Sequence, residues 1–198
     1  EETGNVIITV DGNPFSTTIG NIIYHVGQKT GGCDSLGEAS GSAATYSDGV
    51  TSGVDGKVSV SYRGLEDLWG NVWEFVDGIN IKTSEKQPYV ADNGFVSNKF
   101  AEPYQPSGIT LPADDGFVKD FACSAKADWL LMPATVGGGN NTYVPDCFYQ
   151  NWGNSADKVA QVGGCWTSGS AAGLFRWSFD NRSFAADLAV GARLLLIP

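Results

Sequence analysis

The sequence predicts a single α+β domain of short strands, few helices and many loops. A chain of 198 residues is long enough for one domain with its own core. Its 26 glycines, together with many Ser, Asn and Thr residues, favour loops and short strands over long helices. Alternation with a period of two predicts a strand at 72–77, whereas isoleucines at helical spacing predict a short helix over 19–26.

The stretch around which we expect the chain to be organised is 62–80, which reads YRGLEDLWGNVWEFVDGIN. Its first part, 65–69, is predicted to form one helical turn that Gly70 ends, because glycine tolerates the left-handed conformation of a helix end. The strand that follows is predicted to continue through GINI at 78–81. Aromatic residues of this stretch are expected in the core, where a fully buried large side chain contributes about 1.5–3 kcal/mol. They are Trp69, Trp73 and Phe75.

Alternation and turn residues predict the remaining elements. Apolar residues alternate before the turn cluster DGNP, which predicts a strand, a turn and the entry to a second strand over 4–15. KVSVSY at 57–62 alternates and is predicted as a strand, and the apolar run ADWLLM at 127–132 as a core strand. The expected loops cover 31–55, 83–115 and 136–141.

Charge and hydropathy exclude several functional classes. The net charge of −10 makes nucleic acid an unexpected ligand, because an acidic surface repels phosphates. No run of about 18 apolar residues is present, so we expect no membrane insertion. The first residues carry neither a basic start nor an apolar core of a signal peptide, and the chain lacks an initiator Met. We therefore expect a fragment of a longer protein, whose N-terminal region supports attachment or oligomerisation.

Cysteine and histidine are too sparse to predict a zinc site. The four cysteines form no CxxC pair, and His25 is the one histidine, which we interpret as an ordinary, partly exposed side chain. Free thiols are the expected state of the cysteines, although sequence alone does not give their proximity. No metal or other cofactor is therefore expected.

Three motifs carry a resemblance to a known family. GLEDLWGNVWEF at 64–75 resembles the G-L-x-D-M-x-G-N-V-W-E-W motif of the formylglycine-generating-enzyme (sulfatase-modifying) subtype of the C-type lectin-like fold. VGGCW at 162–166 resembles the R-G-G-S-W of this family, and GARLL at 191–195 resembles its terminal G-F-R-V-V. The three motifs occur in the family's order, which implies a C-type lectin-like fold over 1–198, with 1–60 as the N-terminal part of the domain.

The resemblance also implies two activities that the residues do not match. Formylglycine-generating enzymes are oxidases with a copper-binding cysteine pair, but the surroundings of Cys147 and Cys165 do not match the family's catalytic cysteines, so we expect no enzyme. Glu102-Pro103-Tyr104 resembles the calcium-binding E-P-N of sugar-binding C-type lectins. Its third residue lacks the amide that would ligate calcium and sugar, so calcium-dependent sugar binding is not expected.

Residues 140–190 have a composition that indicates diversification. The last 36 residues, 163–198, contain no Lys, Glu, Gln or Met, whereas roughly five are expected from the composition of the preceding residues. Lys, Glu, Gln, Met and Trp are the residues that randomising the adenines of an asparagine codon cannot give. Randomising a tyrosine codon similarly gives Cys or Phe beside Tyr149. The positions expected to vary, called the variable set below, are Cys147, Phe148, Tyr149, Cys165, Thr167, Ser168, Ala171, Arg176, Ser178, Asp180, Arg182, Phe184 and Asp187.

A second group, the scaffold set, is expected to hold the backbone in place while the variable set points outward on one solvent-facing patch. Substitutions at outward positions usually change stability by less than about 0.5 kcal/mol. The scaffold set consists of Trp69, Trp73, Gly164, Trp166, Trp177 and Arg193.

This pattern resembles the variable proteins of diversity-generating retroelements, which occur in phages, bacteria and archaeal viruses. The resemblance implies a receptor-binding display domain on a virion tail or a cell surface, whose partner is a protein or another cell-surface ligand. The alternative is an undiversified phage tail or adhesin domain of the same fold, and a formylglycine-generating-type oxidase is a more distant one.

Overall fold

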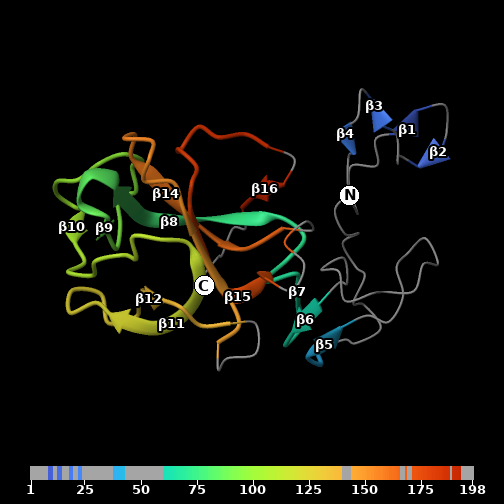
Figure 1. Ribbon diagram of the computed structural model, residues 1–198, viewed down its shortest axis with the longest axis horizontal. Coiled ribbons are helices and arrows are strands. Elements are labelled where there is room, and N and C mark those ends of the chain that lie inside the picture. Colours follow the sequence, from blue (N-terminus) through green and yellow to red (C-terminus); the bar gives the residue numbers. More distant parts are fainter. Residues whose placement is uncertain are drawn as a thin grey trace.

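One strongly curled, mixed β-sheet forms the body of the protein, as the computed structural model shows (Figure 1). The structure describes four two-residue strands within 9–23 and the residues 38–42, 60–139, 144–165, 168, 171–187 and 189–192. Eight strands of the sheet follow one another in the order β10-β9-β8-β14-β15-β13-β11-β12, and β16 pairs with β8 beside this row. The strands are β8 (Trp73–Lys82), β9 (Gln87–Val90), β10 (Gln105–Pro106), β11 (Gly116–Cys123), β12 (Leu131–Val136), β13 (Cys147–Gln150), β14 (Lys158–Gly163), β15 (Gly173–Phe179) and β16 (Val190–Gly191).

Two of the strand pairs in this sheet are parallel. β13 runs parallel to β15, and β16 runs parallel to β8, whereas the other neighbours are antiparallel. Proline occurs in β12, at the end of the row, where a missing N–H costs no ladder bond on the open side. The strands β8 and β14 lie side by side in the middle of the row.

A bulge in β8 contributes to the curl. Val76 pairs with Ala160, but the next pair is Asn80 with Val159, so residues 77–79 have no partner in β14. Gly78 lies at the centre of this bulge with φ +79°, and a Cβ there would lie 2.9 Å from the carbonyl oxygen of Ala91. Such bulges bend the strand and increase its twist. Glycine is therefore required at this position by both the dihedral angle and the space.

The core lies on one face of the curled sheet and contains few of the aromatics expected there. The rings of Phe148 and Phe179 are 5.6 Å apart, centroid to centroid, and both side chains are fully buried. Trp69, Trp73 and Phe75 are instead only half-buried. Trp73 and Phe75 lie on the face of β8 that points away from this core, because Phe75 pairs with Gln161, which in turn pairs with Ser178 on the opposite face of β15 from Trp177. The most deeply buried apolar residues are Ile79, Ile81, Val118, Leu130, Met132, Phe148, Ala160 and Phe179.

Smaller sheets precede the main one along the chain. A three-stranded sheet consists of β5 (Gly41–Ser42), β6 (Val60–Tyr62) and β7 (Leu65–Glu66). Before it lie two separate antiparallel pairs, β1 (Thr9–Val10) with β2 (Asn13–Pro14) and β3 (Thr18–Ile19) with β4 (Ile22–Ile23).

Several predicted strands are confirmed. The strand predicted at 72–77 and its continuation through 81 correspond to β8, and the hairpin predicted over 4–15 corresponds to β1 and β2. The strand predicted at 57–62 matches β6 over its last residues. The strand predicted at 127–132 lies later than expected, at Leu131–Val136, because the Leu130 N–H donates to the Ala127 carbonyl in a turn that precedes it.

The prediction of an α+β fold is wrong. Among the described residues the helical elements are a 3-10 turn, η2 (Thr83–Glu85), and the 3-10 residue Ala171, and the rest is strand or loop. The helical turn predicted at 65–69 begins instead as β7, paired with β6, and Ile19, Ile22 and Ile23 lie in β3 and β4. β-branched residues favour extended backbone, and tertiary pairing overrides a short helical pattern.

The C-type lectin-like fold that the resemblance implied is contradicted with it, because the protein is all-β with a half-barrel sheet. Separately, the part of the chain that the structure describes includes no helix long and apolar enough to cross a membrane.

Candidate functional site

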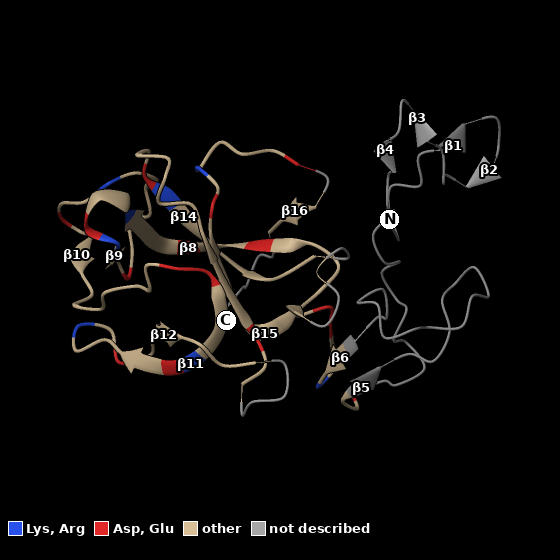
Figure 2. Cartoon of the chain, in the orientation of Figure 1, with Lys and Arg blue, Asp and Glu red and all other residues tan. Residues whose placement is uncertain are grey.

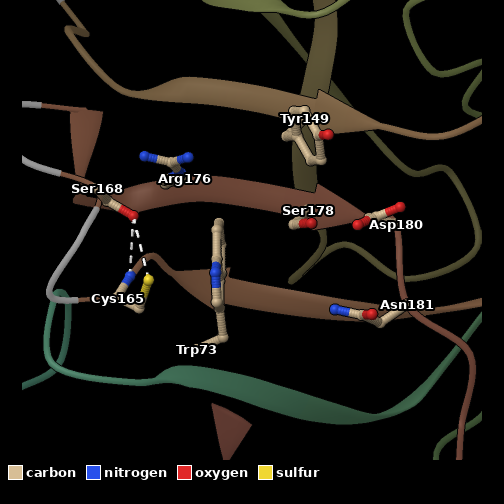
Figure 3. Close-up of a pocket in the computed structure, with 8 residues that line it drawn as sticks. All are labelled: Trp73, Tyr149, Cys165, Ser168, Arg176, Ser178, Asp180 and Asn181. Carbon is tan, nitrogen blue, oxygen red and sulfur yellow. Dashed lines mark hydrogen bonds between the residues drawn. The ribbon is translucent and has the colours of Figure 1, made fainter. Parts of the chain in front are cut away.

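A pocket of about 220 Å³ opens on the face of the main sheet that points away from the aromatic core. Strand alternation explains this position. Trp177 and Phe179 of β15 pack in the core, so Arg176 and Ser178 between them point to the opposite face. Figure 3 shows the residues that line the pocket, which are Trp73, Tyr149, Cys165, Ser168, Arg176, Ser178, Asp180 and Asn181.

The register of four neighbouring strands brings these side chains together. Ser178 of β15 pairs with Tyr149 of β13 on one side and with Gln161 of β14 on the other. Gln161 pairs in turn with Phe75 of β8. Paired residues share a face, as do residues two apart, so Trp73 of β8 and Arg176 of β15 lie on this same face.

Arg176 is the dominant charge of the pocket. Its guanidinium carbon lies 4.8 Å from the centroid of the Trp73 ring, within the range of a cation–π interaction. Its Nε and Nη1 atoms are buried, and no described group accepts a hydrogen bond from either. Burial lowers the pKa of Arg176, while the thiols of Cys147 and Cys165 and the carboxylate of Asp146 act in the opposite direction. The side chain nevertheless stays cationic at neutral pH, because an arginine titrates far above it.

A tight turn holds the residues at one end of the pocket. The backbone N–H of Cys165 donates to Ser168 Oγ at 3.0 Å, and this hydroxyl lies 3.8 Å from Cys165 Sγ (Figure 3). Gly164 has φ +83°, and a Cβ there would lie 3.0 Å from the same hydroxyl oxygen. Glycine is thus needed for the turn that places Ser168 over Cys165.

Amide side chains hold the other end. Asn151 Nδ2 donates to Asp180 Oδ1 at 2.8 Å, and Asn181 Nδ2 donates to Gln161 Oε1 at 2.9 Å. The first bond fixes the carboxylate of Asp180 just after β15, and the second fixes the side chain of Asn181. Asp180 also acts on Lys158, whose pKa is lowered by burial and raised by this carboxylate. The pocket therefore has a cation at one end, a carboxylate at the other and hydroxyl groups between them. Such a lining suits recognition of a polar ligand by charge and hydrogen bonds.

The structure brings six members of the variable set into this pocket. They come from three successive segments between Tyr149 and Asp180, which are β13, the turn after β14, and β15 with its end. Tyr149 is 42% exposed, whereas Cys165 and Ser178 are only 5% and 2% exposed and form the floor. The variable set does not form the single solvent-facing patch that was expected, because Cys165 and Ser178 are buried and Arg182 and Phe184 lie outside the pocket lining. The six residues are Tyr149, Cys165, Ser168, Arg176, Ser178 and Asp180.

Phe148 was expected to contact ligand, and this is wrong. Its side chain is 1% exposed, because alternation along β13 turns it into the core while Tyr149 points outward. Cys147 is half-buried, and burial raises the pKa of its thiol. Cys123 and Cys147 are free thiols, as expected, and Cys33 lies outside the described residues.

The remaining members of the variable set lie outside the pocket lining. Arg182 lies over the ring of Phe184 at 5.8 Å and donates to Asn154 Oδ1 at 3.0 Å, and Phe184 is 74% exposed. Asp187 is exposed and accepts a hydrogen bond from Ala189 N within a local turn. Ala171 is half-buried, and Thr167 lies outside the described residues.

The scaffold set is only partly structural. Gly164 is buried, and Trp69 and Trp177 are half-buried, with Trp177 packed against the core. Trp73 was assigned to the scaffold, but its ring lines the pocket beneath Arg176, so this assignment needs correction. Asn181 also lines the pocket, but the sequence analysis did not predict it as a site residue. Its position two residues after Phe179, in a polar segment, was a weak indication of this role. Trp166 and Arg193 lie outside the described residues, as does His25.

Among the residues that the structure describes, no group of three or more His, Cys, Asp or Glu side chains is placed to hold a metal ion. A scan against protein-family models finds no match to this chain. A search of curated proteins finds no match either. The chemistry and the geometry of the pocket are therefore the basis for assigning a function to this protein.

Proposed function

We propose that this domain is a ligand-binding module whose contact surface is the pocket and the exposed side chains around it, and that outward-pointing residues within 140–190 are diversified by adenine-specific mutagenesis. One observation carries the proposal. Six of the twelve described residues that the codon pattern selected line a single pocket. The register of the strands brings their side chains onto one face, where they form one contact surface.

The surroundings of the pocket have the chemistry of a binding surface. Tyr149 and Phe184 expose aromatic rings, and Arg176 and Arg182 add guanidinium groups. Tyr and Arg are among the residues that most often dominate binding energy at interfaces. The backbone of Tyr149 and Arg176 is held by the sheet hydrogen bonds of β13 and β15, which do not depend on the identity of the outward side chains, whereas Arg182 and Phe184 lie in the segment after β15. Substitutions at the rim therefore alter the surface while the sheet is preserved.

The partner that we propose is a protein or another cell-surface ligand, met by a virion tail or a cell surface that carries this domain. Figure 2 shows acidic residues on several elements of the main sheet and its loops, with basic residues between them. Together with the net charge of −10, this distribution disfavours a nucleic-acid partner.

An undiversified binding domain is the second candidate, and the burial of the pocket floor favours it. Cys165 and Ser178 are nearly inaccessible, so replacement by a large or charged residue would disturb the packing. The nucleotide sequence distinguishes the two candidates. Diversification requires a near-identical template repeat that differs at adenines, beside a reverse-transcriptase gene, and an undiversified domain has neither.

A pair of libraries tests the display role of the protein itself. In the first library, Tyr149, Arg176, Asp180, Arg182 and Phe184 are randomised together. The matched control library randomises five core residues: Ile79, Ile81, Val118, Phe148 and Phe179. We expect most members of the first library and few of the second to stay folded, as read by protease resistance of the displayed domain.

Selection of the rim library against purified proteins then measures binding. Recovery of folded binders to unrelated targets supports a surface that tolerates and uses variation. Equal loss of folding in both libraries would contradict the proposal, because it would show that the rim residues are structural.

A further inference from the structure

We propose that the Arg176 end of the pocket recognises a carboxylate group of the ligand. The inference rests on the proposed binding function and adds the chemical class of the group that is bound. It follows from the guanidinium of Arg176, its contact with Trp73 and the charges nearby.

The guanidinium of Arg176 has buried donors that lack an acceptor. Nε and Nη1 are shielded from water and have no protein acceptor among the described residues. Buried donors without an acceptor are costly, and a charged donor more so than a neutral one. An arginine that serves only the fold normally has its donors paired, so these donors indicate an acceptor that the free protein lacks and that reaches them when the side chains covering Arg176 move on binding.

The neighbours of Arg176 hold its guanidinium in one orientation. The indole of Trp73 lies 4.8 Å from the guanidinium carbon and supports the cation on one side. Cys165 and Ser168, joined by the hydrogen bonds of their turn, line the same end of the pocket. A supported guanidinium loses less side-chain freedom when it binds, and its planar donor array matches a carboxylate in geometry.

The charges around Arg176 favour a carboxylate over a phosphate. Asp180 lines the same pocket, and the buried Asp146 lies close enough to act on the pKa of Arg176. The chain as a whole carries a charge of −10. A doubly charged phosphate doubles its attraction to Arg176 and its repulsion from these carboxylates alike, but its desolvation costs more than twice as much as that of a monoanion, and a single guanidinium neutralises only one of its charges. The pocket therefore favours a monoanion.

A titration of the full chain with small probes tests this inference without any substitution at Arg176. The probes are sodium propionate, its neutral isostere propionamide, sodium phosphate and sodium chloride, compared at constant ionic strength. The indole N–H resonance of Trp73, assigned with a Trp73→Phe variant, reports binding beside the guanidinium. We expect a saturable shift with propionate only. A saturable shift of equal affinity with propionamide or phosphate, or none with propionate, overturns the inference.

Two variants and a matched control assign the effect to Arg176. We expect Arg176→Gln to weaken propionate binding by about tenfold or more, because a charge-assisted hydrogen bond is lost, and Arg176→Lys to weaken it less. Arg63 lies over the ring of Tyr62 at 5.4 Å and does not line the pocket, so Arg63→Gln should leave binding unchanged. Unchanged affinity in a folded Arg176→Gln variant overturns the inference, and if that variant does not fold, the comparison of propionate with propionamide decides.

The outcome is separable from that of the proposed function. If propionate does not bind while the rim library still yields folded binders, the carboxylate inference alone fails. If the rim library does not fold, the proposed display role fails whatever the probes show.

Discussion

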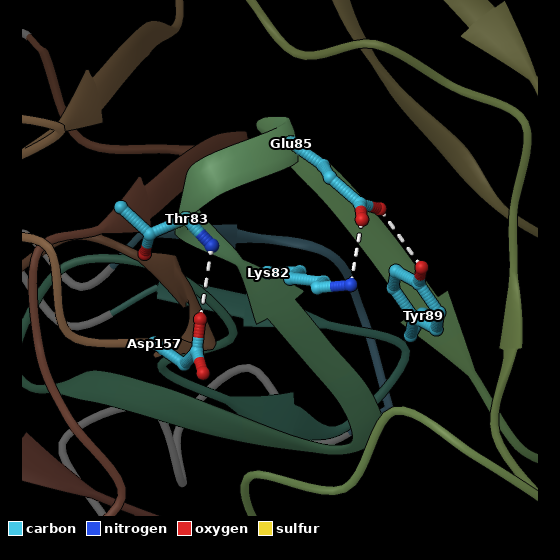
Figure 4. A network of polar contacts seen from close by, with 5 residues as sticks. All are labelled: Lys82, Thr83, Glu85, Tyr89 and Asp157. Carbon is cyan, nitrogen blue, oxygen red and sulfur yellow. Dashed lines mark hydrogen bonds and ion pairs between the residues drawn. The ribbon is translucent and has the colours of Figure 1, made fainter.

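Lys82, Glu85 and Tyr89 form a polar network where β8 turns into β9 (Figure 4). Lys82 Nζ lies 2.6 Å from Glu85 Oε1, and the Tyr89 hydroxyl donates to Glu85 Oε2 at 2.8 Å. On the other side of the turn, Thr83 N donates to Asp157 Oδ1 at 3.2 Å, which ties the turn to the segment before β14. A carboxylate with two donors thus fixes the corner that starts β9.

This network predicts a pH dependence of stability. Hydrogen bonds from Lys82 and then Tyr89 lower the pKa of Glu85, so ionised Glu85 stabilises the fold above the pKa of the unfolded chain, about 4.3. The contribution is lost as the pH falls through the lower pKa of the folded state. Glu85 likewise raises the pKa of Lys82, a contribution that is present below about pH 10.4 and lost as the pH rises through the folded value. We expect Glu85→Gln to flatten the change in melting temperature between pH 5 and pH 2.

The matched control is Glu102→Gln, which removes an exposed carboxylate that accepts a hydrogen bond from the neutral amide of Gln105, at 3.0 Å from its Nε2. Its acid profile should follow that of the unsubstituted protein. Superimposable profiles for Glu85→Gln and the unsubstituted protein would show that the network does not contribute to stability.

Gly173 is a second residue whose identity the packing requires. A Cβ at this position would overlap the carboxylate of Asp146, which accepts from Phe175 N at 2.6 Å. We expect Gly173→Ala to lower the free energy of unfolding by about 1–3 kcal/mol, as overpacking does. The cost should shrink in an Asp146→Ala background, because the colliding atoms are then absent.

Chemical denaturation of the four proteins in this cycle gives the coupling energy between the two positions. Gly153→Ala is the control, because the nearest atom to its added Cβ would be Asn151 Oδ1 at 3.8 Å, an ordinary contact. Additive effects of Gly173→Ala and Asp146→Ala would contradict the collision.

Strand alternation decides which side chains reach the pocket, and β13 shows this over two consecutive residues. Phe148 points into the core beside Phe179, and Tyr149 points to the pocket. The codon pattern predicted both residues as ligand contacts, because a codon does not indicate on which face of a strand a side chain lies. The same alternation along β15 separates Arg176 and Ser178 from Trp177 and Phe179.

The two neighbours should therefore respond oppositely to truncation. We expect Phe148→Ala to lower the free energy of unfolding by about 3–5 kcal/mol, because it removes a fully buried ring. Tyr149→Ala should lower it by about 1 kcal/mol or less, because the side chain is 42% exposed. Denaturant midpoints measure both values, and a larger cost for Tyr149→Ala than for Phe148→Ala would contradict the assigned faces.

At the scale of the molecule, distant segments make the sheet. β8 pairs with β14 and β16, which come much later in the chain. β13 pairs in parallel with β15, although β14 lies between them in sequence. The bulge at Gly78 and the irregular registers of β14 and β15 allow this row to curl. The pocket exists only where four of these strands lie side by side.

Such a topology predicts slow folding. Loop closure must precede most of the strand pairing, and β proteins with non-local contacts fold in roughly milliseconds to seconds. Stopped-flow refolding followed by tryptophan fluorescence should give rates in that range. Refolding in microseconds would contradict the non-local pairing of β8, β14 and β16.

Sequence patterns were sufficient for local features. The alternation from Val72 onward predicted β8, and the turn cluster DGNP predicted the hairpin of β1 and β2. The codon pattern selected six residues that prove to line one pocket. It also selected Phe148, because a codon carries no information about which face of a strand a residue occupies.

The sequence by itself determined that this chain is rich in short strands, that it is acidic and that its last 36 residues lack Lys, Glu, Gln and Met, since these properties depend on composition and on residues close together along the chain. Only the tertiary structure decided that the protein is all-β, that Trp73 supports Arg176 and that Cys165 and Ser178 form a floor. The physical reason is that β pairing joins residues far apart in sequence. The register of those pairs, which no local pattern contains, assigns each side chain to the core or to the pocket.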